Sequence, residues 1–360
     1  MPFVKKISLV HFRNYLSASF DFTDRIIGIC GANGSGKTNL LDAVYYLCFT
    51  KSYFSKPEIK NTYYGENGFA IRGIVSENPK DSEVSCVFRE NGRKEFYTDG
   101  EQIKKFSKHI GRFPAVMIAP DDAIIITGGS EERRKFLDTV LSQLYPAYLQ
   151  SLINYNRILL QRNSCLKNIA ETQSGNYDLL DIFDKQLAEY GESIFVKRKE
   201  FTEKIIPLVI QQYNEIAEKN EAIQILYSSA LLQENSLMLL KENRQKDLLL
   251  QRTTDGIHKD DLHFYLDNES FKQVASQGQR KSMLFALKLA EYYFIREIKK
   301  QFPILLLDDV FEKLDQQRML NLLRKVCIGS DSQIFITDTH KHRLDEAFKE
   351  LDLQYQMIGL

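Results

Sequence analysis

The segment Gly31–Thr38 reads GANGSGKT and fits the pattern G-x-x-x-x-G-K-[S/T] in full. It follows the apolar run 25–30 (RIIGIC) and precedes 39–49 (NLLDAVYYLCF), whose composition favours a helix. Gly34 and Gly36 allow the backbone N–H groups to curl around an anion at the start of that helix. This feature restricts the chain to an α/β fold with a parallel sheet that binds the phosphates of a nucleotide.

The residues of this loop have distinct expected roles. Lys37 is expected to reach the β- and γ-phosphates of ATP, and Thr38 to offer its hydroxyl to Mg²⁺. A glycine-rich turn that carries a lysine by chance is the alternative, and the flanking strand and helix make it the weaker one. The expected nucleotide-binding residues of the segment are Gly31, Ala32, Asn33, Gly34, Ser35, Gly36, Lys37, Thr38 and Asn39.

Two adjacent carboxylates end a second apolar run, PILLLDDVF (303–311). Parallel sheets bind ligands at the carboxyl ends of their strands, where Asp308 and Asp309 are expected to lie. Asp308 is predicted to hold Mg²⁺ together with Thr38, and Asp309 to orient or deprotonate the attacking water. Two solvated carboxylates at a strand end are the alternative. Lys37, Asp308 and Asp309 are therefore the candidate catalytic residues.

A third polar segment, 276–281 (SQGQRK), opens a long amphipathic pattern that continues to Lys300. Ser276 and Gln279 have the spacing of a capping box, in which each side chain accepts from the backbone N–H of the other residue. A capped helix N-terminus also attracts anions. The local pattern therefore fits both a helix cap and an anion site.

Hydrophobic periodicity predicts strands, then long helices, then an alternation of strands and helices, which is typical of a parallel sheet. Asn91-Gly92 and Asp267-Asn268 are predicted to be hairpin turns. The predicted strands are 6–12, 25–30, 70–76, 83–90, 94–100, 303–311 and 332–339. The predicted helices are 39–49, 131–145, 147–170, 177–220, 276–300, 315–327 and 342–351. We expect an ATPase head made of 1–112 and 225–360, with a mainly helical arm inserted at 113–224.

Together, these segments resemble the ATP-binding-cassette ATPases, more narrowly the heads of the SMC/Rad50 group, and within that group the RecF family of bacterial DNA replication and repair proteins. The segments that carry this resemblance are HFRNY (11–15), GKTNLLDAVYYL (36–47), APDD (119–122), GGSEERRKFLD (128–138), DGIHKDDL (255–262) and SQGQRK (276–281). Three positions depart from the family pattern. Asp42 replaces a Glu, and Ile257 and Lys259 replace Pro and Arg. Because Lys lacks the fork of an Arg, the DGIHKDDL loop is given no role.

The resemblance implies a homodimer that forms on ATP, with each ATP held between the P-loop of one copy and the signature motif of the other. Ser276, Gln277 and Gly278 would form that motif, with Ser276 donating to the γ-phosphate. Arg13 would approach the nucleotide, and His340 would occupy the switch position. Asp315 would cross the dimer interface. A surface arginine, a surface histidine and a helix N-cap, respectively, remain the alternatives for these last three residues.

The resemblance also implies a weak, DNA-stimulated ATPase of DNA-damage repair, recombination and replication-fork maintenance. It would bind duplex and gapped DNA and act with RecO and RecR to load recombinase. The alternatives are another SMC/Rad50-type head, which would carry a much longer coiled coil, a nucleotide-binding subunit of a transporter, and a P-loop kinase. Dimerisation on ATP separates a member of the RecF family, which should dimerise, from a kinase, which need not.

Composition limits where DNA could bind. Lys plus Arg and Asp plus Glu both total 48, so no global basic excess exists and any DNA surface must be local. The candidate phosphate contacts lie in the arm, and a solvated helix face is the alternative. They are Arg157, Arg162, Lys167, Lys197, Arg198 and Lys199.

The five cysteines form no C-x-x-C pair, which favours free thiols in a reducing compartment. The start MPFVKKISLV lacks the apolar stretch of a signal peptide, and the longest apolar run is too short to span a bilayer. We therefore expect a cytoplasmic protein without membrane contact.

Overall fold

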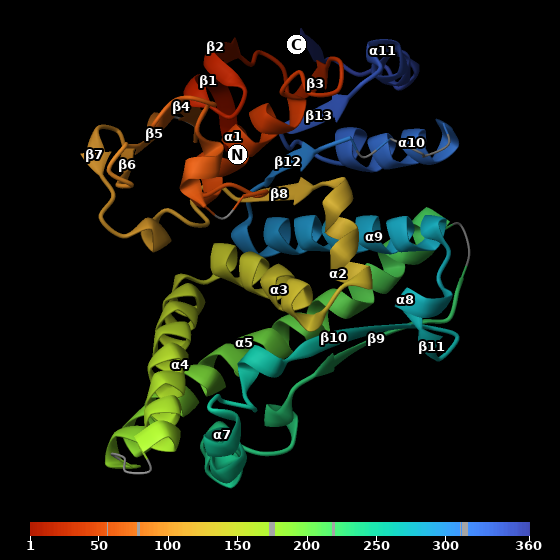
Figure 1. The fold of residues 1–360 in the computed structure, drawn as a ribbon. Helices are drawn as coiled ribbons and strands as arrows, with labels where there is room; N and C mark the ends of the chain where they lie inside the picture. Colours follow the sequence, from red (N-terminus) through yellow and green to blue (C-terminus); the bar gives the residue numbers. More distant parts are fainter. Residues whose placement is uncertain (56, 78–79, 173–176, 218–219, 310, 312–315) are drawn as a thin grey trace. The chain divides into compact units, whose positions relative to one another are not determined.

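The computed structural model describes residues 1–360 except 56, 78–79, 173–176, 218–219, 310 and 312–315. The described chain forms two compact units (Figure 1). Unit 1 comprises Met1–Asp122 and Leu287–Leu360, and unit 2 comprises Ala123–Ala286. The signature segment and the candidate DNA contacts therefore belong to unit 2, and the P-loop, Asp308 and Asp309 belong to unit 1.

Unit 1 is built around a five-stranded sheet with the order β14-β3-β13-β12-β8, in which every pairing is parallel. Its strands are β3 (Ile26–Cys30), β8 (Ala115–Ile118), β12 (Ile304–Leu307), β13 (Ile334–Asp338) and β14 (Gln356–Gly359). All residues of β3, β8, β12 and β13 are buried, as expected for strands covered on both faces. The predicted α/β fold with a parallel sheet is confirmed, and the carboxyl ends of these strands meet at one edge.

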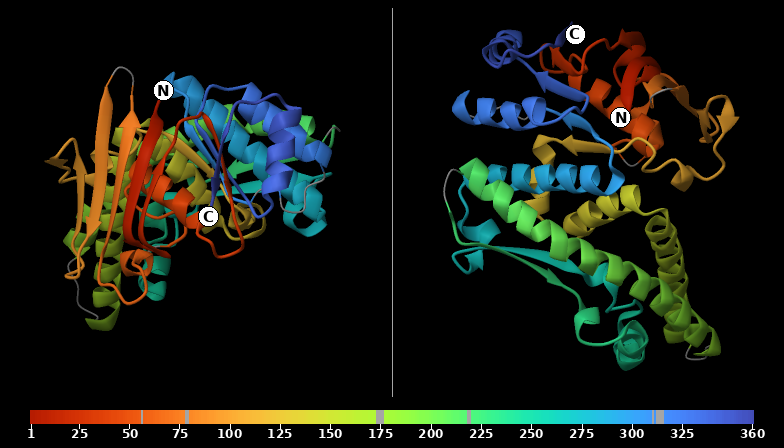
Figure 2. Two further views of the ribbon diagram at one scale, coloured as in Figure 1. Left: turned by 90° about the horizontal axis from the view of Figure 1, so that it is seen from above. Right: turned by 180° about the vertical axis from the view of Figure 1, so that it is seen from behind.

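A second sheet of unit 1 is antiparallel, with the order β2-β1-β4-β5-β6-β7 (Figure 2). Its strands are β1 (Phe3–Phe12), β2 (Tyr15–Asp21), β4 (Phe69–Ser76), β5 (Asp81–Phe88), β6 (Lys94–Thr98) and β7 (Glu101–Gln102). Burial alternates along β4 and β5, so one face of the sheet packs inward. The predicted Asn91-Gly92 turn joins β5 to β6, with Gly92 at φ 75°.

Helix α1 (Lys37–Phe49) contacts strands of both sheets, including β4 and β13. Nearly all of its residues are buried, and its apolar side chains belong to one core cluster with residues of both sheets. Unit 1 also contains α10 (Gln316–Leu323), a π-helical turn (Arg324–Ile328) and α11 (Lys341–Glu350), which contacts β3. The helix predicted at 315–327 thus ends in this π-helical turn.

Unit 2 is mainly helical. Its helices are α2 (Ile124–Thr127), α3 (Ser130–Leu144), α4 (Pro146–Thr172), α5 (Tyr177–Ala217), α6 (Ser236–Glu242), α7 (Arg244–Leu250) and α8 (Phe271–Val274). A small antiparallel sheet has the order β11-β10-β9, with β9 (Ile223–Ser228), β10 (Asp261–Leu266) and β11 (Glu269–Ser270). The long helix α5 pairs with α4 and contacts β9 (Figure 2). The predicted turn at Asp267-Asn268 joins β10 to β11, and both residues have positive φ.

Helix α9 (Gln277–Lys299) begins in unit 2, and its residues from Leu287 onward belong to unit 1. Short 3-10 turns complete the described elements. They are η1 (Glu58–Asn61), η2 (Phe106–Lys108), η3 (Pro120–Ala123), η4 (Ala230–Leu232) and η5 (Ile257–Lys259).

The compact units differ from the segments predicted for head and arm. Strand β8 lies within the predicted arm, yet it pairs with β12 in the parallel sheet of unit 1. The segment 225–286 was expected in the head and instead belongs to unit 2. The reason is that β9 pairs with β10, and these two strands contact α5 and α3 of the same unit.

Candidate nucleotide-binding site

The predicted phosphate loop connects β3 to α1 at the carboxyl edge of the parallel sheet. Gly36 immediately precedes α1 and has φ 112°, a left-handed conformation that favours glycine. A Cβ at this position would lie 2.7 Å from both Asn14 Nδ2 and Tyr15 Oη. The loop therefore requires glycine here for backbone conformation and for space.

Lys37 lies inside the curve of this loop and is 4% exposed. Its Nζ donates to the carbonyl oxygens of Gly31 at 3.0 Å and Ala32 at 3.1 Å. The ammonium group is thus directed at the concave side of the loop. Since the N-terminus of α1 also begins here, the positive potential of the helix dipole adds to the lysine charge.

Residues of the HFRNY segment brace the loop from outside. Asn14 Nδ2 donates to Ser35 O at 3.0 Å, and the Tyr15 hydroxyl donates to Gly36 O at 3.0 Å. Asn39 Nδ2 in turn donates to Asn14 Oδ1 at 2.7 Å. The sequence analysis singled out the whole segment but gave a role to Arg13 alone, so the contacts of Asn14 and Tyr15 with the loop were missed.

The loop and the acidic strand end meet, although 270 residues separate them. The Thr38 hydroxyl lies 2.9 Å from Asp308 Oδ1 and 3.0 Å from Oδ2. Thr337, at the end of β13, donates to Asp308 Oδ1 at 2.9 Å and accepts from the Asp309 backbone N–H at 2.8 Å. The loop after β3 and the ends of β12 and β13 therefore bring two hydroxyls and one carboxylate together. Thr337 was not predicted as part of this site.

Asp309 follows directly and adopts φ 42°, which is uncommon for a residue other than glycine. Backbone strain of this kind concentrates at functional positions, where the surrounding structure holds it in place. Here the hydrogen bond from its N–H to Thr337 holds the conformation. The backbone of Asp309 is thus fixed next to Asp308, and the action of its carboxylate on the attacking water stays a prediction.

Burial raises the pKa of Asp308 from its ordinary value to about 6, against the lowering effect of the hydrogen bonds from Thr337 and Thr38. The ionised carboxylate is therefore poorly stabilised by the protein alone. A neighbouring cation would compensate for the lost hydration. A raised pKa of this kind is typical of a carboxylate that binds a cation, when the cation is absent.

Replacement of Asp308 by Asn is expected to stabilise the nucleotide-free protein. Folding raises the pKa of Asp308, so its ionised form lowers the free energy of unfolding. This loss is absent below the unfolded-state pKa and is complete once the pH has risen through about 6. We expect a gain of about 2–3 kcal/mol at pH 7.5 and roughly half of that at pH 5. Urea denaturation of both proteins at the two pH values measures this. Equal stability at pH 7.5 would contradict the assignment.

The donor set fits Mg²⁺ and ATP. Thr38 and Asp308 supply two oxygen ligands, which suits an ion that takes its other ligands from phosphates and water. The buried hydroxyl of Ser35 has no hydrogen-bond partner in the part of the chain that the structure describes, so a phosphate oxygen would satisfy it. The described residues contain no cluster of three or more His, Cys, Asp or Glu side chains that would hold a metal on their own.

Arg13 was expected to approach the nucleotide. In the structure its Nη2 donates to Asp42 Oδ2 at 2.8 Å and to the Ser52 hydroxyl at 3.0 Å. Asp42 is fully buried and also accepts from the backbone N–H of Tyr53 at 2.7 Å. Burial raises the pKa of Asp42, opposed first by the Arg13 charge. The observed role of Arg13 is to neutralise this carboxylate, and its approach to a nucleotide stays a prediction.

His340 precedes α11 and is exposed, as expected for a residue at the end of a parallel strand. Its backbone N–H donates to Asp338 Oδ1 at 2.7 Å. Asp338, the last residue of β13, also accepts from Arg343 Nε at 3.0 Å. The turn is therefore fixed, and a contact from His340 to the γ-phosphate stays a prediction. Asp315, the predicted interface residue, lies outside the described residues.

The signature segment forms the capping box that its sequence predicted. Ser276 N–H donates to Gln279 Oε1 at 2.8 Å, and Gln279 N–H donates to Ser276 Oγ at 3.2 Å. Ser276 and Gln277 are exposed at the start of α9, and Gly278 is half-buried. The prediction of a capped helix is confirmed, and contact with a second copy stays a prediction.

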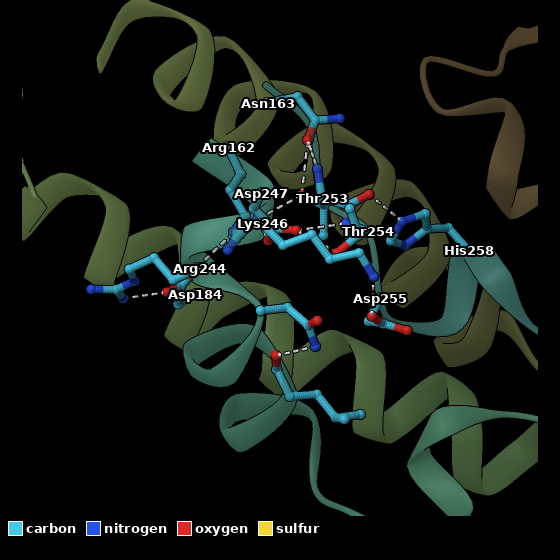
Figure 3. A network of polar contacts seen from close by, with 12 residues as sticks. Arg162, Asn163, Asp184, Arg244, Lys246, Asp247, Thr253, Thr254, Asp255 and His258 are labelled. Carbon is cyan, nitrogen blue, oxygen red and sulfur yellow. Dashed lines mark hydrogen bonds and ion pairs between the residues drawn. The ribbon is translucent and has the colours of Figure 1, made fainter. Parts of the chain in front are cut away.

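Two of the arginines considered for DNA contact are buried instead. Arg162, on α4, is 0% exposed and binds Asp184 on α5 at 2.6 Å and Asp247 on α7 at 2.7 Å (Figure 3). It also donates to Thr253 Oγ1 at 2.8 Å. Arg198, on α5, is 1% exposed. The prediction was wrong for these two because spacing along a helix does not reveal which charged residue faces inward.

Arg162→Met is expected to destabilise the protein by about 3–5 kcal/mol, because it leaves two buried carboxylates without one of their cationic partners. The matched control is Arg157→Met on the same helix. Arg157 is exposed, so its replacement should change stability by less than about 0.5 kcal/mol. Urea denaturation monitored by circular dichroism compares the two. Equal losses of stability in the two variants would show that the ion pairs of Arg162 do not hold α4, α5 and α7 together.

The DGIHKDDL loop is held by the second buried arginine. Arg198 Nη1 donates to Ile257 O at 2.6 Å and to Asp260 Oδ2 at 2.7 Å. His258 Nδ1 lies 2.8 Å from the Tyr155 hydroxyl, and burial lowers the pKa of His258 to about 4. Arg133, from the GGSEERRKFLD segment, makes a two-pronged ion pair with Asp261. Two segments of the family pattern therefore meet within unit 2.

No described helix is both long and apolar enough to cross a membrane. The five cysteines are free, and four of them are buried. The prediction of free thiols is confirmed.

Similarity to known proteins extends over nearly the whole chain. Residues 3–357 match the family model described as RecF/RecN/SMC N terminal domain. The DNA replication and repair protein RecF of Flavobacterium johnsoniae is 41% identical over 357 residues, with 99% of each chain covered. That of Cytophaga hutchinsonii is 38% identical over 356 residues, covering 99% of this chain and 94% of the relative.

Solved structures agree with this. The structure of the recombination mediator protein RecF-ATP in the RecFOR pathway has a TM-score of 0.88 and 32% identity, and covers 94% of this chain and 92% of that one. An Smc head bound to the C-winged helix domain of ScpA has a TM-score of 0.55 and 13% identity, so it shares the fold alone. Since full-length relatives exceed 30% identity and the site has the geometry of a P-loop ATPase, the chain belongs to the RecF family of DNA replication and repair proteins.

Proposed function

We propose that this chain is an ATP-dependent DNA-binding protein of repair, recombination and replication-fork maintenance. ATP drives two copies together on duplex or gapped DNA, and slow hydrolysis, stimulated by DNA, separates them. The observation that carries the proposal is the contact between Thr38 of the P-loop helix and Asp308 of the β12 end. Both side chains offer oxygen atoms of the kind that Mg²⁺ prefers, so their contact beside the phosphate loop supports a shared Mg²⁺ site.

Each residue of this site has a task in the proposed reaction. Lys37 and the N-terminus of α1 stabilise charge on the β- and γ-phosphates. Mg²⁺, when bound, neutralises phosphate charge, and Thr38 and Asp308 hold it. Asp309 orients the attacking water and accepts its proton.

The signature segment completes the site across the dimer. Ser276, Gln277 and Gly278 open the capped helix α9, and they lie at the surface or close to it. Such a helix start suits an anion. We propose that it meets the γ-phosphate bound by the second copy, so that dimerisation requires ATP rather than ADP.

The names of the similar proteins support a set of proposed partners for this chain. One matched structure is a recombination mediator of the RecFOR pathway, which supports RecO and RecR as partners and recombinase loading as the outcome. DNA binding is proposed through phosphate contacts without sequence reading. Among the residues considered, Arg157, Lys167 and Lys199 are exposed, although Lys167 also lies 3.7 Å from Glu171. The cytoplasm is the proposed location.

Sedimentation of the full chain tests the proposal. We expect a dimer with ATP and Mg²⁺, a monomer with ADP or without nucleotide, and a larger dimer fraction when gapped duplex is added. The affinity for duplex DNA in ATP should fall steeply with salt, because phosphate contacts release counterions. The same sedimentation with ATP and with ADP would contradict the proposal. Tight ATP binding by a permanent monomer would favour a P-loop kinase.

A further inference from the structure

A chain of hydrogen bonds within unit 2 ties the start of α9 to the end of α5. Tyr213, in the last turns of α5, donates its hydroxyl to Glu221 Oε2 at 2.5 Å. Gln279 donates its Nε2 to the same carboxylate oxygen at 3.0 Å. Since Gln279 also closes the capping box with Ser276, one polar path runs from α5 to the signature serine.

Glu221 determines which way the Gln279 amide faces. A carboxylate only accepts hydrogen bonds, so Gln279 must turn its NH₂ group toward Glu221. That orientation turns Oε1 toward the backbone N–H of Ser276, 2.8 Å away. The opposite orientation would place the amide oxygen against the carboxylate and an NH₂ group against the N–H. Glu221 therefore selects the one orientation in which Gln279 caps α9.

The capping box in turn prepares the Ser276 hydroxyl. Its oxygen accepts from the Gln279 N–H at 3.2 Å, which leaves its own hydrogen free to be donated outward. Ser276 is exposed, so that hydrogen can reach a group outside the chain. A hydroxyl set as a donor is what a phosphate oxygen requires, because such an oxygen only accepts.

Packing holds Tyr213, the first residue of this hydrogen-bond chain, in a fixed position at the end of α5. Tyr213 is fully buried, and its ring packs edge-to-face on Phe271 of α8 at 6.3 Å between centroids. Burial, and then the hydrogen bond to Glu221, raise the pKa of Tyr213, so it remains a donor throughout the physiological range. Arg280 Nη2 donates to Lys272 O at 2.8 Å and joins the first turn of α9 to α8.

We infer that Glu221 is a positioning residue for Ser276: it fixes the Gln279 amide and thereby the hydroxyl that meets ATP on a second copy of the chain. This inference rests on the proposed function of the signature segment and goes beyond it. It assigns a role to a residue outside every segment of the family pattern and makes the C-terminal end of α5 part of the dimerisation site.

The test measures the concentration of a non-hydrolysable ATP analogue that gives half-maximal dimerisation in sedimentation, with Mg²⁺ present. Glu221→Ala should raise this midpoint about five- to tenfold, the equivalent of one or two lost hydrogen bonds. Analogue binding to the monomer at Lys37 should be unchanged. Glu221→Gln should recover most of the wild-type midpoint, because it keeps an acceptor oxygen for both donors. Glu203→Ala, at an exposed position of α5, is the matched control.

Other outcomes are decisive as well. A wild-type midpoint for Glu221→Ala would overturn the inference, and so would equal midpoints for the Ala and Gln variants, which would point to lost packing. If Glu221→Ala does not fold, Tyr213→Phe keeps the ring on Phe271 and removes only the hydroxyl. It should raise the midpoint about two- to threefold, and an unchanged midpoint would again overturn the inference.

Ser276→Arg, measured alongside, separates this inference from the proposed function. If Ser276→Arg dimerises as the wild type does, the signature segment has no role across the dimer, and the proposed function fails first. If Ser276→Arg stays monomeric while Glu221→Ala has the wild-type midpoint, only the role of Glu221 fails.

Discussion

Replacement of Asp309 by Asn is expected to lower ATP turnover by about two to four orders of magnitude, the usual contribution of a general base. The reason lies in its position. Asp309 is held next to Asp308 by its backbone hydrogen bond to Thr337, with φ 42°. Asn keeps the shape and this backbone contact but is a poor proton acceptor. Single-turnover hydrolysis of ATP with Mg²⁺ measures the effect.

ATP binding should be retained in Asp309→Asn, because Lys37, Thr38 and Asp308 are unchanged. The variant should therefore stay dimeric on ATP for longer than the wild type does. A matched control is Asp352→Asn, a change at an exposed position outside the site. Turnover at the wild-type rate in Asp309→Asn would remove this residue from the mechanism.

The second large effect concerns the signature segment. Ser276→Arg is expected to abolish dimerisation on ATP while ATP still binds at Lys37. The new side chain is long, and it removes the hydroxyl oxygen that accepts from Gln279 N–H at 3.2 Å. It would fill the space that the γ-phosphate of the other copy needs. Sedimentation gives the oligomeric state, and equilibrium dialysis gives ATP binding.

Ser276→Thr provides the matched control, since it keeps the hydroxyl and the cap. It should dimerise close to the wild-type ATP concentration. If the Arg variant dimerises as well as the Thr variant, Ser276 is a helix cap and nothing more. If neither variant binds ATP, the change has disturbed the fold, and thermal unfolding will show it.

Much of the site was predictable because short sequence motifs carry its functional groups. The P-loop contains its own glycines, lysine and threonine. Parallel strands end at one edge of the sheet, so Asp308 was expected next to this loop although 270 residues separate it from Thr38. The capping box of Ser276 and Gln279 was likewise a matter of spacing.

Other features depend on packing that no short pattern encodes. The ion pair of Arg13 with the buried Asp42 was not predicted, because it depends on which carboxylate the fold buries and must neutralise. Arg162 was assigned to DNA, and it is fully buried between three helices. Strand β8 has four residues and no alternation, so neither its existence nor its place in the parallel sheet was predicted.

The raised pKa of Asp308 also makes cation binding a proton-exchange reaction. With a pKa raised to about 6, this carboxylate would be partly protonated near pH 6, and a divalent cation that binds there would release that proton. The apparent affinity for Mg²⁺-ATP should therefore rise between pH 5.5 and 7 and then level off. In isothermal titration calorimetry at pH 6, the observed enthalpy should change with the ionisation enthalpy of the buffer, and at pH 8 this dependence should vanish.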